Sequence, residues 1–91
     1  MENLKITKKE YYFLKAFDNS GNDYGYISRE YNNDLSLYCY EPYKLSNYWA
    51  CKTDPAPIWL DKNMFGFIKF RDEKAWSIRD LLKLGAEYEE W

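Results

Sequence analysis

The sequence predicts one α+β domain over residues 1–91, with an N-terminal helix, an antiparallel sheet of three to five short strands and a C-terminal helix. Three observations lead to this prediction. Each end of the chain carries a helix start signal, the middle alternates apolar and polar residues as strands do, and the length is that of a single domain. A domain of this size needs large side chains in its core, and the chain supplies 10 Tyr, 5 Phe and 4 Trp.

The first helix is expected over residues 8–17. Thr7 and Glu10 have the spacing of a capping box, in which each side chain accepts a hydrogen bond from the other residue's backbone N–H. Ile6 and Tyr11 occupy the staple positions on either side of this cap. Apolar residues then recur at the three- and four-residue spacing of one buried face: Tyr11, Leu14 and Phe17, with Phe13 beside them.

Two strands, residues 24–30 and 35–40, are predicted to pair as an antiparallel hairpin around the Asn-Asn-Asp turn at residues 32–34. In the second strand Leu35, Leu37 and Cys39 share one face, so Cys39 is expected to be a small core residue.

The next part of the chain is expected to be looser. Pro42 interrupts the second strand, and residues 43–46 are expected to be a loop. A third strand is predicted over residues 47–52, and residues 58–60 are a short strand or an extended segment. Residues 65–70 are apolar on both faces, which predicts a central, doubly covered strand.

The last helix has both a start and a stop. Ser77 is the expected N-cap, with Asp80 three residues later, and Trp76 and Leu81 stand in the staple positions. Gly85 is the expected terminator. The tail, residues 86–91, could fold back through its aromatic residues or stay free.

Composition argues against an enzyme. The chain has no histidine, which removes Ser–His and Cys–His pairs and most zinc chemistry. The spacing of Cys39 and Cys51 fits no metal motif, and the four glycines form no phosphate loop. We therefore expect no catalytic residue, no cofactor and no metal site.

The chain also lacks an 18-residue apolar run and the apolar core of a signal peptide, so we expect a cytoplasmic protein with reduced thiols and no membrane contact. A net charge of −2 is too balanced to indicate nucleic-acid binding.

Tyrosine is the unusual feature. Aromatic residues with a polar group are enriched at protein–protein hot spots. The strand alternation places tyrosines on shared faces of the predicted hairpin, and more follow directly after it. The resulting predicted partner-binding surface comprises Tyr24, Tyr26, Tyr38, Tyr40, Tyr43, Tyr48 and Trp49.

Several occupants of this face remain open. It could bind another protein, form a homodimer interface, or lie under a helix with only its hydroxyls in water. Single-stranded nucleic acid is disfavoured, because only Arg29, Lys44 and Lys52 lie close to the aromatic residues.

Three segments resemble a class of small uncharacterised proteins encoded by phages and prophages of Gram-positive bacteria. They are YISRE at residues 26–30, YEPYK at 40–44 and FIKFRDEKAWSIRDLLKL at 67–84. The class shows a YIARD strand, a YENKPYK strand and turn, and a final FIKWEDEEPWSIEDLLKL block; the positions at which this chain departs from that block include Arg71, Lys74 and Ala75. The resemblance brings no activity with it. It implies a phage-encoded cytoplasmic accessory protein that binds a host protein, and we expect an inhibitor of a host defence or regulatory protein.

Overall fold

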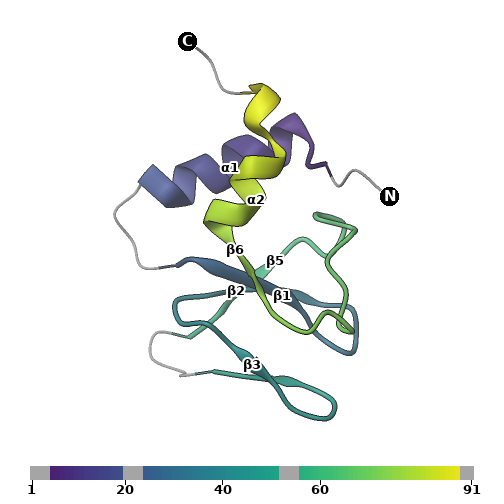
Figure 1. Cartoon of the computed structure of the whole chain (residues 1–91). Coiled ribbons are helices and arrows are strands. Elements are labelled where there is room, and N and C mark those ends of the chain that lie inside the picture. Colours follow the sequence, from purple (N-terminus) through teal and green to yellow (C-terminus); the bar gives the residue numbers. More distant parts are fainter. Residues whose placement is uncertain (1–4, 20–23, 52–55, 89–91) are drawn as a thin grey trace.

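The computed structural model describes residues 5–19, 24–51 and 56–88 of the chain. Two helices lie over one side of a four-stranded antiparallel sheet, and a separate two-stranded hairpin lies under the other side (Figure 1). The predicted α+β class, with a helix at each end and an antiparallel sheet between them, is confirmed. In chain order the elements are α1 (Lys8–Asn19), β1 (Tyr26–Arg29), β2 (Leu35–Tyr38), β3 (Tyr43–Lys44), β4 (Trp49–Ala50), β5 (Ile58–Leu60), β6 (Trp76–Ser77), α2 (Ile78–Leu84) and the 3-10 turn η1 (Ala86–Tyr88).

The main sheet has the strand order β5-β2-β1-β6. Ile27 pairs with Leu37 and Tyr26 with Tyr38. Because side chains alternate along a strand, this register separates two sides of the sheet. The helix side carries Ile27, Leu35 and Leu37, all fully buried in the core. The hairpin side carries Tyr26, Ser28, Ser36, Tyr38 and, by its pairing with Ser36, Trp59.

Both helix starts form as their residues predict. Glu10 N–H donates to Thr7 Oγ1 over 3.1 Å, and Thr7 N–H donates to Glu10 Oε1 over 2.8 Å. At α2, Asp80 N–H donates to Ser77 Oγ over 3.1 Å. Helix α1 continues to Asn19, two residues beyond the expected end.

Gly85 follows α2 as its C-cap, as expected. Its φ of −109° is not left-handed, so backbone conformation does not require a glycine here. A Cβ atom at this position would lie 2.7 Å from Tyr11 Cδ1 and 2.8 Å from Ile6 Cδ1. The glycine therefore lets the end of α2 approach the start of α1. Tyr88 folds back onto the same place, donating its hydroxyl to Ile6 O over 3.2 Å; Trp91 lies outside the described residues.

The predicted central strand at residues 65–70 is wrong. These residues form turns, and the strand beside β1 is the two-residue β6. Phe65 has a φ of 49°, which a continuous strand does not allow. The apolar residues on both faces instead pack in different places: Phe65 and Ile68 enter the core, Phe67 contacts Trp76, and Phe70 contacts Tyr31.

Two buried charged residues hold this loop. Phe65 N–H donates to Glu10 Oε2 on α1. Arg29, at the end of β1, donates to five backbone carbonyls: its Nε to Ile68, its Nη1 to Asn33 and Lys62, and its Nη2 to Met64 and Phe65, over 2.7–3.1 Å. All five guanidinium N–H groups can be satisfied in this way. The loop conformation is thus set by residues far away in the sequence.

The strand boundaries also differ from prediction. Strand β1 begins at Tyr26 and β2 ends at Tyr38, so Cys39 falls outside the ladder and is half-buried instead of in the core. The expected third strand at residues 47–52 shrinks to β4, which pairs with β3 in the expected loop at residues 43–46. Lys52 lies outside the described residues. The β3–β4 hairpin, residues 43–50, is not part of the main sheet.

Candidate functional site

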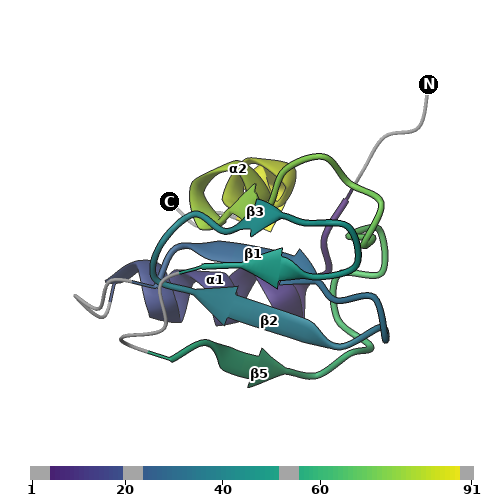
Figure 2. The same ribbon diagram turned by 90° about the horizontal axis from the view of Figure 1, so that it is seen from below.

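The hairpin side of the sheet is covered in part by the β3–β4 hairpin and not by a helix. Figure 2 looks from this side, with β3 in front of the sheet and the helices behind it. Trp49 is the main contact: its indole is 6% exposed, and its Nε1 donates to Arg29 O over 2.9 Å. Lys44 Nζ lies 5.1 Å from the centroid of the Trp49 ring and 4.8 Å from that of Phe70. The buried hydrogen bond of Trp49 and the cation–π contact of Lys44 with Phe70 therefore hold the hairpin to the domain, while the contact of Lys44 with Trp49 lies within the hairpin.

The seven predicted surface residues divide into two groups. Tyr38 on β2 and Trp49 on the hairpin are buried, at 3% and 6% exposure, because the hairpin packs against this side of the sheet through Trp49. They contribute to packing inside the domain. The prediction that they lie on the binding surface is therefore wrong. Tyr26 is half-buried on the same side. The accessible members are Tyr40, Tyr43 and Tyr48, with Tyr43 62% exposed. Their binding role stays a prediction.

Tyr24 leaves the expected face because it precedes the first ladder pair. Its ring packs toward Phe17 and its hydroxyl donates to Ala56 O over 2.8 Å.

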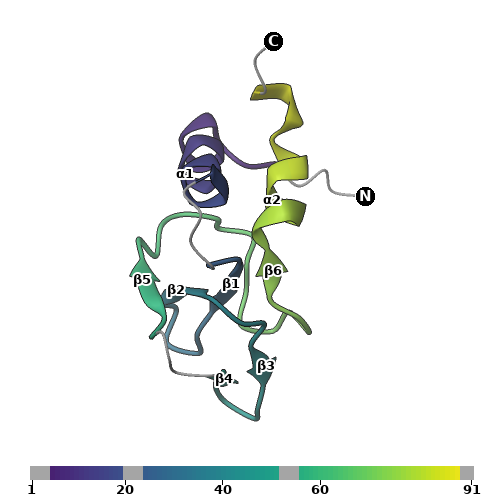
Figure 3. The same cartoon turned by 90° about the vertical axis from the view of Figure 1, so that its left-hand side faces the viewer.

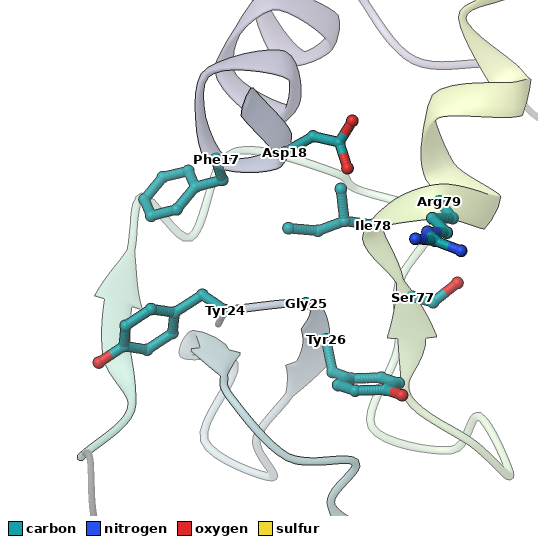
Figure 4. A pocket seen from close by; sticks show the side chains of 8 residues that line it. All are labelled: Phe17, Asp18, Tyr24, Gly25, Tyr26, Ser77, Ile78 and Arg79. Atoms are coloured by element: carbon teal, nitrogen blue, oxygen red, sulfur yellow. The ribbon is translucent and has the colours of Figure 1, made fainter. Parts of the chain in front are cut away.

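Figure 4 shows the rings of Tyr24 and Tyr26 extending to opposite sides of a pocket of about 380 Å³ between the end of α1, the start of β1 and the start of α2. Asp18 and Arg79 lie at its rim, and Ser77 is already used as the N-cap. We find no set of groups in this pocket that converges on one ligand atom.

Sequence reasoning missed two exposed aromatic residues of the sheet and its turns. Trp59 on β5 is 67% exposed, and Tyr31 in the β1–β2 turn is 75% exposed. Figure 3 shows the β3–β4 hairpin under the β1–β6 end of the sheet, with β5 at the opposite edge. The alternation of Ile58, Trp59 and Leu60 indicates that Trp59 faces the opposite side from its two neighbours. A segment of three residues does not decide which of those sides is buried.

Two adjacent cavities flank Trp59, and we call them together the Trp59 groove. The larger, about 330 Å³, lies between the hairpin and the β2–β5 part of the sheet. The smaller, about 300 Å³, lies toward the β1–β2 turn. Glu30 and Trp59 line both. The larger cavity is also lined by Ser36, Tyr38, Trp49, Cys51, Ala56 and Pro57, and the smaller by Tyr31, Asn32 and Asn47.

Glu30 supplies the charge of the groove. Tyr38 donates its hydroxyl to Glu30 Oε1 over 2.8 Å, which orients the carboxylate. Burial raises the pKa of Tyr38 to about 12, and the hydrogen bond to Glu30 contributes to the increase. Tyr38 is therefore a permanent donor at neutral pH. No Lys or Arg is among the described residues that line either cavity.

Residues 5–19, 24–51 and 56–88 contain no cluster of three or more His, Cys, Asp or Glu side chains that could hold a metal ion. Within the same residues, neither helix has the length and apolarity needed to cross a bilayer.

Comparisons with protein-family models, curated proteins and solved structures found no match to this chain. The resemblance to small phage proteins therefore stays an expectation from its sequence segments.

Proposed function

We propose that this chain is a non-catalytic accessory protein that acts by binding another protein. The observation that supports this proposal is the distribution of exposed apolar side chains. Among the described residues, Tyr12 on α1 is the exception, and the others gather around the hairpin and the β5 edge: Tyr31, Tyr40, Tyr43, Leu45, Tyr48, Ile58 and Trp59. Clustered exposed aromatic residues are typical of interaction sites, and Tyr and Trp carry much of the binding free energy there.

The resemblance adds the biological setting of the proposal. We take the protein to be of phage origin and to act in the cytoplasm of a Gram-positive host. Its partner in this proposal is a host defence or regulatory protein, which it inhibits by occupying a surface. The small size of the chain and its aromatic surface suit such a role.

Affinity capture from a Gram-positive host lysate tests the proposal. The bait is compared with a Tyr43→Ser/Tyr48→Ser variant, which alters two exposed hairpin residues, and with Tyr12→Ser, which alters an exposed tyrosine on α1. We expect a stoichiometric partner whose affinity falls by about tenfold or more in the hairpin variant. Tyr12→Ser should bind as the wild type does. The absence of such a partner, or equal binding by the two variants, contradicts the proposal.

Self-association is the alternative, and the β5 edge favours it. Strand β5 pairs only with β2 in the described sheet, so its outer edge carries backbone groups that a second copy could pair with. Light scattering distinguishes the two functions. A strict 11.1 kDa monomer at high concentration excludes the homodimer, while a stable dimer that buries the tyrosines removes the case for a host partner.

A further inference from the structure

We propose that the Trp59 groove binds the guanidinium group of an arginine side chain carried by the partner protein. The inference deepens the proposed function, on which it rests: the exposed tyrosines supply contact area, and the groove supplies chemical selectivity.

Three aromatic side chains, Tyr38, Trp49 and Trp59, line the larger cavity. Trp49 and Tyr38 form its buried part, and Trp59 stands exposed at its outer edge. Indole rings attract cations through their electron-rich faces, and the flat guanidinium group also stacks on them. The chain already uses this attraction on the same hairpin, because Lys44 Nζ lies 5.1 Å from the Trp49 ring centroid.

The charge of the groove selects a cation. Glu30 lines both cavities, and no basic side chain does so among the described residues. Its Oε1 is held by the Tyr38 hydroxyl, so the carboxylate is oriented before a partner arrives. Oε2 has no hydrogen-bond partner in the described part of the chain, and a carboxylate oxygen next to aromatic walls suits the paired N–H groups of arginine.

Other chemical groups would bind in the groove less favourably than a guanidinium group. A phosphate or an acidic side chain would be repelled by Glu30. An apolar side chain would remove the carboxylate from water without giving it a donor, which is unfavourable. A lysine ammonium carries the charge, but it lacks the flat surface and the fixed pair of donors. A cavity of about 330 Å³ is also at the small end of ligand sites, which suits one side chain.

The test uses the full-length protein and a matched pair of peptides. Acetyl-Gly-Arg-Gly-amide is titrated against its citrulline counterpart, which keeps the shape of arginine and removes the charge, while NMR follows the indole N–H of Trp59. We expect saturable shifts with a dissociation constant on the order of 1 mM for the arginine peptide. The citrulline peptide should bind at least about tenfold more weakly, and a lysine peptide should fall between them.

Two variants locate the effect. Glu30→Gln keeps an acceptor for the Tyr38 hydroxyl and removes the charge, and we expect it to weaken arginine binding about tenfold. Glu41→Gln is the matched control, because it removes the same charge at an exposed position outside both cavities. Trp59→Leu, an exposed position that should not affect folding, is expected to weaken binding several-fold. Equal binding of the arginine and citrulline peptides, or no difference between Glu30→Gln and Glu41→Gln, overturns the inference.

The failure of this inference can be separated from that of the proposed function. If a captured partner depends on Tyr43 and Tyr48 but its binding is unchanged by Glu30→Gln, the arginine site is wrong and the binding function stands. If the arginine peptide binds selectively and no stoichiometric partner exists, the groove is real and the proposed function is wrong.

Discussion

At the scale of single residues, Arg29 shows how a buried charge organises this small domain. It is 4% exposed, and burial lowers the pKa of its guanidinium from the ordinary value. It has no carboxylate partner among the described residues, and its hydrogen-bond partners are five carbonyl oxygens. Four of the five belong to residues 62–68, so one side chain of β1 determines the path of that loop.

Replacing Arg29 should therefore be costly even when the charge is kept. Lysine offers three donors at one point and cannot reach carbonyls spread around a planar fork. We expect Arg29→Lys to lower the free energy of unfolding by about 3 kcal/mol or more, because several buried carbonyls lose their donors. Urea denaturation measures this, with the exposed Arg71→Lys as a control that should change stability by less than about 0.5 kcal/mol. A loss below about 1 kcal/mol for Arg29→Lys would show that the loop at residues 62–68 keeps its conformation without the guanidinium hydrogen bonds.

Tyr38 should make stability depend on alkaline pH. Its pKa is about 12 in the folded chain and about 10 in the unfolded chain. Below pH 10 the hydroxyl is protonated in both states, and its contribution is fully present. Between pH 10 and 12 the unfolded state loses its proton first, so the stability falls, by about 2–3 kcal/mol in total.

Comparison with Tyr38→Phe isolates this effect. The variant loses the hydrogen bond to Glu30, so it should be less stable at pH 8, and the gap to the wild type should narrow as the pH rises above 10. Tyr43→Phe, at an exposed position, should follow the wild type throughout. Urea midpoints measured from pH 8 to pH 11.5 test this. A gap that stays constant over this range would mean that Tyr38 does not titrate differently in the folded state.

At the scale of elements, the β3–β4 hairpin depends on its docking. Each strand has two residues, and an isolated two-stranded hairpin is only marginally stable in water. Trp49 supplies what the ladder lacks, with a buried indole and a hydrogen bond to Arg29 O. The hairpin is thus attached to the backbone of Arg29 at the end of β1. The side chain of the same Arg29 holds the loop at residues 62–68.

Trp49→Phe should loosen the hairpin before it unfolds the domain. The substitution removes the indole donor and part of the cation–π contact, and we expect a loss of about 1–3 kcal/mol. Hydrogen exchange should show lower protection in the ladder of Tyr43, Lys44 and Ala50, while Ile27 and Leu37 in the central strands stay protected. Tyr48→Phe, exposed in the same hairpin, is the matched control. Unchanged protection of the hairpin in Trp49→Phe would mean that other contacts hold it.

At the scale of the whole molecule, the two sides of the sheet are covered by different means. The helix side is aliphatic, and the stripes of α1 and α2 bury it. The hairpin side is built from Ser and Tyr, whose hydroxyls need partners, and a small hairpin covers only part of it. At the β5 edge, Trp59 and Glu30 line the larger cavity, and Trp59 is 67% exposed. Among residues 5–19, 24–51 and 56–88, no further helix or strand lies over the exposed aromatic residues there.

The candidate surface was only partly predictable from the sequence. Tyr40, Tyr43 and Tyr48 were identified from composition and are accessible. Tyr38 and Trp49 were identified by the same reasoning and are buried, since composition does not say which aromatic residues the chain itself will cover. Trp59 was missed because its exposure depends on pairing with Ser36 and on where the hairpin ends.

The sequence by itself determined the parts of the fold that local interactions control. The capping box of Thr7 and Glu10, the Ser77 cap and the turn between β1 and β2 all join residues within a few positions, so their signals are visible in the chain. Only the tertiary structure decided the path of residues 65–70, because its hydrogen bonds reach Arg29, 36 residues before Phe65, and Glu10, 55 residues before it. An apolar segment has no fixed conformation of its own, and here the distant donors and acceptors that it must satisfy select turns over a strand.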